Sequence, residues 1–162
     1  MKANELSVDI IDRFQRSYPV DMIGMAKALN LRIVEEELPD SISGKIERDW
    51  FNNDFYITVN SKHGENRKRF TIAHEIAHFI LHRDLIGDGI TDNGLYRDER
   101  IGDTRERQAN RYAATLLMPK NLVKKAWDAG IRDASQLASA FKTSLPVAEI
   151  RWRELGCVLW PR

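Results

Sequence analysis

Apolar side chains recur at helical spacing near the start of the chain. Leu6, Ile10, Ile11 and Phe14 fall on one side of a helix, so they predict an amphipathic helix there. A second short helix is predicted over residues 21–29. The chain is therefore expected to open with two helices.

The pattern then changes to the shorter period of strands. Leu31 and Ile33 alternate with polar residues, residues 42–48 are a weaker candidate, and residues 55–59 form the clearest strand. Residues 52–54 have the composition of a hairpin turn. We therefore expect a small antiparallel sheet.

Helical patterns return for the rest of the chain. A long helix is predicted over residues 67–82, and residues 83–102 follow it as a charged stretch that contains several glycines. A loop of that length inside a domain is often functional, so we expect it to shape a cleft. Further helices are predicted over residues 103–117, 121–129 and 133–141, with a last helix that has Pro146 in its first turn and Gly156 after its end. The order of helices, sheet and helices predicts an α+β fold.

Composition excludes several classes of function. The 162 residues carry a formal net charge of +1, which does not indicate a strongly basic nucleic-acid surface. The single cysteine, Cys157, cannot form an internal disulfide, so we expect a reducing compartment such as the cytoplasm. No signal-peptide core and no apolar stretch of membrane-spanning length is present, so no membrane association is expected.

The chemistry of the long helix lies in its sequence His74-Glu75-Ile76-Ala77-His78. Residues four apart share one helix face, so both imidazoles can reach one ion, and Glu75 can approach a water on that ion. Imidazole and carboxylate ligands suit zinc, whose catalytic sites have three protein ligands and one open position. The alternative is a helix that carries two histidines by chance, but the neighbouring side chains are almost all apolar, and buried polar groups need partners.

A third ligand is expected on the helix predicted over residues 103–117. Glu106 is favoured and Asp103 is its main rival, while an exposed Glu106 paired with a neighbouring arginine is the alternative without a metal. Asn110 lies one turn beyond Glu106 and is expected to accept a hydrogen bond from the free ring nitrogen of a ligating histidine. His82 is interpreted as a residue near the site or at the helix end, and His63 has no motif support, so both stay outside the ligand set.

Two segments together resemble the ImmA/IrrE family of metallopeptidases. Residues 69–82, Arg-Phe-Thr-Ile-Ala-His-Glu-Ile-Ala-His-Phe-Ile-Leu-His, resemble the family's active helix. Residues 106–119, Glu-Arg-Gln-Ala-Asn-Arg-Tyr-Ala-Ala-Thr-Leu-Leu-Met-Pro, resemble its second signature, Glu-x-Glu-Ala-Asn-x-Phe-Ala followed by Leu-Leu-Met-Pro. Gln108 stands where a second Glu is common, which favours Glu106 as the ligand, and Tyr112 replaces a common Phe.

The resemblance implies a zincin-like fold, with zinc held by His74, His78 and Glu106, and with Glu75 as general base. It also implies a partner, a helix-turn-helix transcriptional regulator encoded nearby, as substrate or as antitoxin. We expect one compact domain with a catalytic core at residues 1–119 and a helical segment at residues 120–162 packed on it.

The helical segment itself resembles a helix-turn-helix over residues 137–153. A recognition helix presents polar side chains near its N-terminus, whereas residues 145–148 are Leu, Pro, Val and Ala, and the basic Arg151 and Arg153 come late. We therefore favour packing on the core over direct DNA binding.

The predicted activity is zinc-dependent hydrolysis of a peptide bond in such a regulator. The substrate is expected to pair as an extended strand with the edge of residues 55–59. The alternatives are a toxin of a toxin–antitoxin pair and a binding partner that sequesters the regulator without cleaving it.

Overall fold

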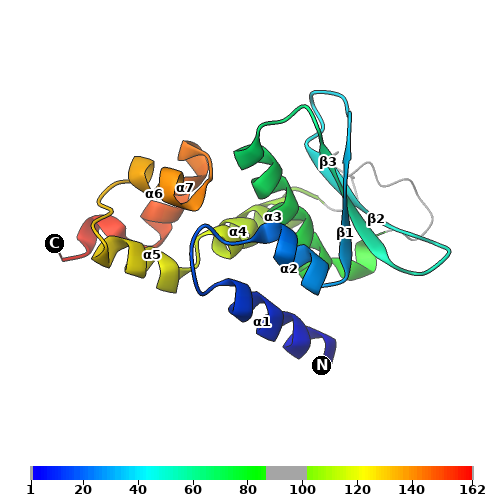
Figure 1. Ribbon diagram of the computed structural model, residues 1–162, viewed down its shortest axis with the longest axis horizontal. Helices are drawn as coiled ribbons and strands as arrows, with labels where there is room; N and C mark the ends of the chain where they lie inside the picture. Colours follow the sequence, from blue (N-terminus) through cyan, green and yellow to red (C-terminus); the bar gives the residue numbers. More distant parts are fainter. Residues whose placement is uncertain (1, 87–101, 162) are drawn as a thin grey trace.

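The structure is a computed structural model that describes residues 2–86 and 102–161, with only the helical backbone described for residues 2–4, 102 and 103. Seven α-helices, two short 3₁₀ helices and a three-stranded sheet occur in these ranges (Figure 1). They are α1 (Lys2–Phe14), α2 (Met22–Ala28), β1 (Leu31–Glu36), β2 (Gly44–Arg48), β3 (Phe55–Asn60), α3 (Glu65–Leu81), η1 (Arg83–Leu85), α4 (Gly102–Leu117), α5 (Lys120–Asp128), α6 (Ala134–Phe141), α7 (Leu145–Glu154) and η2 (Cys157–Leu159). The mixed α+β class is confirmed. None of the described helices has both the length and the apolar character that a membrane span requires.

The sheet has the strand order β1-β3-β2 and is mixed, so the prediction of an antiparallel sheet is wrong for one of its two pairs. β2 and β3 form the expected antiparallel hairpin, with Ile46 opposite Ile57. β1 pairs with the other edge of β3 and runs parallel to it, with Ile33 also opposite Ile57. β1 and β3 are parallel because the chain reverses direction twice between them. It reverses once in the segment between β1 and β2 and once in the hairpin between β2 and β3.

β3 is the central strand and has no free edge. The expected pairing of a peptide with residues 55–59 therefore cannot occur, since partners occupy both sides of the strand. The free edges of the sheet belong to β1 and β2. Phe55, Ile57, Thr58, Val59 and Asn60 are all buried, as expected for a strand in the middle of a sheet.

β2 lies against α3 through a close contact at Gly44. A Cβ atom at this position would lie 2.5 Å from the Thr58 carbonyl oxygen and 2.5 Å from the Thr71 methyl group. Gly44, which has no side chain, is therefore the residue that allows β2 to approach the helix.

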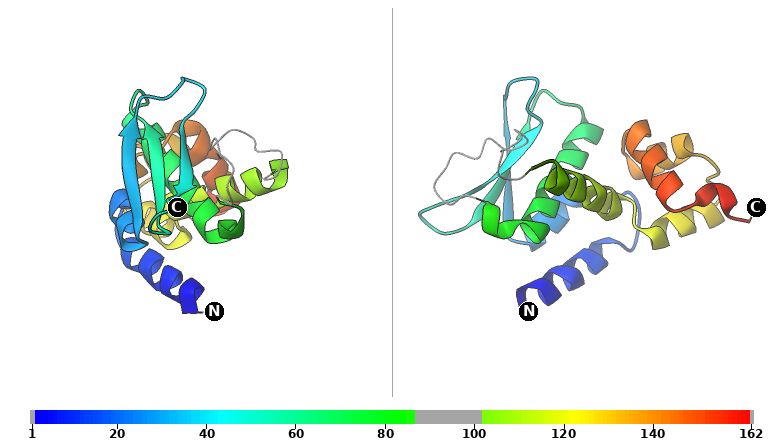
Figure 2. Two further views of the ribbon diagram at one scale, coloured as in Figure 1. Left: turned by 90° about the vertical axis from the view of Figure 1, so that its right-hand side faces the viewer. Right: turned by 180° about the vertical axis from the view of Figure 1, so that it is seen from behind.

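α3 is the central helix of the fold. It contacts both the sheet and α4, and the nine consecutive residues from Thr71 to Phe79 are buried. The views from the side and from behind show the sheet and α4 on different sides of α3 (Figure 2). A helix buried on this scale imposes a desolvation cost on each of its polar side chains unless that side chain finds a partner.

The C-terminal helices α5 to α7 lie at the opposite end of the molecule from the sheet (Figure 1). The Arg69 side chain on α3 donates to the carbonyl oxygens of Phe141 and Lys142 at 3.2 and 3.1 Å. Arg151 on α7 donates from Nε to the Met118 carbonyl oxygen at 2.8 Å, just beyond the end of α4. These bonds attach the helical segment to the rest of the chain, and the boundary at residue 119 stays a prediction.

The helix-turn-helix pattern corresponds to α6, a turn with Lys142 in the left-handed region, and α7. Arg151, one of the two basic residues expected late in the second helix, is buried against Met118. Arg153 is exposed. The burial of Arg151 agrees with packing on the core, the interpretation that we favoured over DNA contact.

Candidate metal centre

Three side chains from two helices meet at one point. His74 and His78, one turn apart on α3, have their Nε2 atoms 3.0 Å from each other. Glu106 on α4 places one carboxylate oxygen 3.2 Å from His74 Nε2 and the other 3.1 Å from His78 Nε2. The structure thus brings together the three residues that the sequence selected.

These three side chains fit a divalent cation. Their ligand atoms all lie within 4.8 Å of one another, and the two imidazoles are buried. In a tetrahedral site with ligand bonds of about 2.0–2.1 Å, neighbouring ligand atoms lie about 3.3 Å apart, close to the separations seen here. Two imidazole nitrogens and a carboxylate facing one another this closely need a proton or a cation between them.

The carboxylate of Glu106 is held in its charged form. Burial by itself would raise the pKa of Glu106, but hydrogen bonds and charge interactions with His74 and His78 lower it to about 2. An ionised carboxylate is the form that binds a metal. Glu106 therefore has the protonation state of a ligand over the whole physiological range.

Glu75 lies beside the first histidine on α3 and is only 1% exposed. A carboxylate with so little contact with bulk water is unusual in a folded protein. Its burial next to His74 agrees with the position expected of a general base.

His82 and Gln108 extend the cluster beyond the predicted ligands. The Nδ1 atoms of His78 and His82 are 3.0 Å apart, and His82 Nε2 lies 3.1 Å from Gln108 Oε1. Burial lowers the pKa of His82, and the bond to Gln108 acts in the opposite direction. The sequence places His82 one turn after His78, but nothing local links it to Gln108, which lies on another helix.

Asn110 and His63, two other residues considered from the sequence, have other described surroundings. Asn110 is exposed and lines a groove with Phe70 and Val147, while His78 Nδ1 faces His82, so a hydrogen bond from a ligating histidine to Asn110 stays a prediction. His63 bonds to the Asp40 carbonyl oxygen at 3.3 Å. The side chain of Asp103, the rival ligand, lies outside the described residues.

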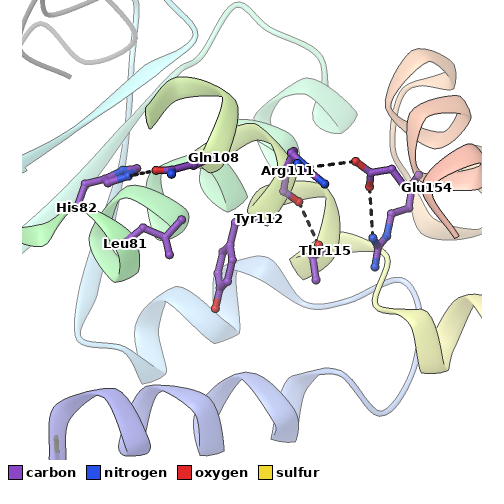
Figure 3. Close-up of a pocket in the computed structure, with 8 residues that line it drawn as sticks. Leu81, His82, Gln108, Arg111, Tyr112, Thr115 and Glu154 are labelled. Atoms are coloured by element: carbon purple, nitrogen blue, oxygen red, sulfur yellow. Dashed lines mark hydrogen bonds and ion pairs between the residues drawn. The ribbon is translucent and has the colours of Figure 1, made fainter. Parts of the chain in front are cut away.

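An open pocket of about 490 Å³ adjoins the cluster between α3, α4 and α7 (Figure 3). His82 and Gln108 line one end of it, and Arg111 and Glu154 line the other, where Glu154 pairs with both Arg111 and Arg151. The loop expected at residues 83–102 lies almost entirely outside the described residues.

Comparison with known proteins shows that this chain matches a family. The family model described as the IrrE N-terminal-like domain matches residues 26–153. The radiation response metalloprotease IrrE of Deinococcus radiodurans is 42% identical over 69 residues, which cover 41% of this chain and 20% of that protein. The protein of the same name from Deinococcus deserti is 41% identical over 69 residues, or 41% of this chain and 24% of the relative.

A solved structure shares the fold. A Mycobacterium tuberculosis transcriptional regulator superposes with a TM-score of 0.60 at 18% sequence identity, over 98% of this chain and 48% of that one. The chain therefore spans about half of that structure and a quarter or less of the Deinococcus proteins.

Proposed function

This chain belongs to the IrrE N-terminal-like domain family, and from that membership we propose that it is a zinc-dependent endopeptidase. The observation that carries the proposal is the convergence of His74, His78 and Glu106 at distances of 3.0 to 3.2 Å. The name metalloprotease, which both Deinococcus relatives have, agrees with it. In this proposal the chain has a zincin-like fold, with the ligands on two packed helices.

The three ligands would hold zinc with one position open. When bound, zinc polarises a carbonyl group and lowers the pKa of water toward about 7. Glu75 would take the proton from the attacking water and deliver it to the leaving amine. The position of Glu75, buried and directly after the ligand His74 on α3, supports this role.

The substrate would be a protein segment in extended form, bound along the outer edge of β2. This edge replaces the edge of β3, which is paired on both sides. β2 is the strand that approaches α3 at Gly44, next to Thr71 and less than one helical turn from His74. Peptides commonly bind to such edges through main-chain hydrogen bonds.

We propose that the substrate is a helix-turn-helix transcriptional regulator encoded nearby. The support is the family membership and the paired sequence signatures of α3 and α4. A toxin that acts on another target, or a partner that binds the regulator without cutting it, predicts a different outcome of the experiment below.

The test compares wild type with Glu75→Gln on the regulator from the neighbouring gene. Cleavage, followed by mass spectrometry of the products, should fall by about 10²- to 10⁴-fold in Glu75→Gln while zinc content is unchanged. Glu65→Gln is the matched control, since Glu65 lies on the same helix but its side chain is 85% exposed. Equal cleavage by wild type and Glu75→Gln would refute the mechanism, and binding without cleavage by either would support the sequestering partner.

A further inference from the structure

A chain of side-chain contacts leads from the metal centre to the second helix by a route separate from Glu106. It runs from His78 Nδ1 to His82 Nδ1 over 3.0 Å, and from His82 Nε2 to Gln108 Oε1 over 3.1 Å. His78 and His82 are buried, whereas Gln108 lies at the wall of the adjoining pocket (Figure 3). Neither His82 nor Gln108 belongs to the proposed ligand set or to the proposed acid–base chemistry.

The two contacts allow only certain positions for the protons. An amide oxygen can only accept a hydrogen bond, so the His82 nitrogen that faces it must carry the proton. The other nitrogen of a neutral His82 is then a bare acceptor. Because that nitrogen faces His78 Nδ1, the proton between the two rings belongs to His78, and with a metal in place of a proton on Nε2 it is the single proton of a neutral ring.

We infer that Gln108, acting through His82, fixes the tautomer of His78 so that its Nε2 lone pair points at the metal. His82 and Gln108 are thus positioning residues, and the inference rests on the proposed metal site. The opposite arrangement has the Gln108 amide group donating to His82. It would place a proton on His78 Nε2, where it would face His74 and Glu106 and prevent ligation.

The two histidine ligands are held differently. In the described part of the chain, His74 Nδ1 has no hydrogen-bond partner, so no protein group sets its tautomer. His78 instead depends on α4, which supplies both Glu106 and, two residues later, Gln108. A single helix therefore provides the third ligand and orients the second, and this couples the geometry of the site to the packing of α4 on α3.

The expected effect of losing Gln108 or His82 is that of losing a hydrogen-bond partner of a metal ligand. Loss of such a partner costs about 10- to 100-fold in metal affinity or activity. We expect the lower end for Gln108→Leu, since water in the adjoining pocket can replace the amide oxygen in part. His82→Leu removes the acceptor of His78 itself and should approach the upper end.

The experiment measures proton positions directly. In zinc-loaded protein with ¹⁵N-labelled histidine, long-range ¹H–¹⁵N NMR should show His78 protonated on Nδ1, and His82 protonated on Nε2 and bare on Nδ1. Zinc affinity, measured by competition with a chelator, should fall about 10-fold in Gln108→Leu and be restored in Gln108→Glu, whose carboxylate also accepts.

The matched control is Gln15→Leu. Gln15 donates to the Leu116 carbonyl oxygen near the end of α4, so its loss perturbs the same helix by the same chemical change. It should leave the His82 tautomer and the zinc affinity unchanged. An equal loss of affinity in Gln15→Leu and Gln108→Leu would show a merely structural role and overturn the inference.

Other outcomes separate this inference from the proposed function. A wild-type protein that binds no zinc refutes the metal site itself. A wild-type protein that binds zinc with His82 protonated on Nδ1 refutes only the orienting chain, as does a Gln108→Leu variant with unchanged affinity and unchanged ¹⁵N shifts.

Discussion

Two groups of polar side chains are buried or half-buried in this molecule, and they find their partners in different ways. Arg69 and Arg151 donate to backbone carbonyl oxygens of segments far away in sequence. His74, His78 and Glu106 turn their polar atoms toward one another. The arginines find carbonyl acceptors already in place, and Arg151 also pairs with Glu154, whereas the convergent ligand atoms leave room for a cation.

The comparison distinguishes a structural role from a chemical one for buried polar groups. Arg69 joins α3 to the carbonyls of Val20, Phe141 and Lys142, so its loss should affect stability. Two of the three ligands, His74 and His78, lie on the same helix as Arg69, yet their loss should affect metal binding.

The largest effect is expected for Glu106→Ala. Removal of one of three protein ligands should lower zinc affinity by more than about 100-fold, since even a partner outside the ligand set can reach that value. Isothermal titration calorimetry with a competing chelator measures it. Glu149→Ala, at an exposed site on α7, should bind zinc as wild type does. Wild-type affinity in Glu106→Ala would abolish the distinction between the two groups.

Arg69→Met should lower stability without changing zinc binding. It removes a half-buried guanidinium that donates to three carbonyl groups, so the free energy of unfolding should fall by about 2 kcal/mol. Chemical denaturation of the zinc-free protein provides the measurement. Zinc affinity of the folded variant should stay as in wild type, and a parallel loss of affinity would show that the two roles are not separate.

Arg151→Met should have a smaller effect of the same kind. The Met118 carbonyl, at the C-terminal end of α4, would lose the donor that satisfies it, at a cost of about 1–2 kcal/mol. Denaturation should show this loss with unchanged zinc binding. A variant as stable as wild type would mean that water replaces the guanidinium, and that α7 contributes little to the end of α4.

The smallest effect is expected for Asn110→Ala. The sequence suggested that Asn110 orients a ligand, but its side chain is exposed and His78 faces His82. Zinc affinity should therefore change less than about 2-fold, well below the 10-fold scale of an orienting partner. A 10-fold loss, measured by the same chelator competition, would restore the role predicted from the sequence.

Local patterns predicted most of the helices and the hairpin, because helical spacing and turn composition act over a few residues. The strand order could not be predicted in this way. β1 is as compatible with pairing to β2 as to β3 on its own pattern, and its parallel position beside β3 is decided by contacts between distant segments. Gly44 shows the same limit, since its contacts with Thr58 and Thr71 are absent from the sequence pattern.

The three ligands could be predicted from the sequence, but one contact beyond them could not. His74 and His78 share a helix face by spacing alone, and the second signature selected Glu106, which the structure places beside both. The contact between His82 and Gln108 was not predicted. It joins the end of α3 to α4, and the sequence does not show which residues of these two helices face each other. The position of His82 four residues after His78 was its one available signal.

The central claim is that His74, His78 and Glu106 bind one zinc ion. X-ray absorption spectroscopy at the zinc edge, on protein loaded with one equivalent, tests it most directly. We expect one zinc per chain, with two imidazole ligands at about 2.0–2.1 Å and the remaining positions filled by oxygen. A sulfur ligand at about 2.3 Å, which would point to Cys157, or zinc that is lost on desalting, would contradict the claim.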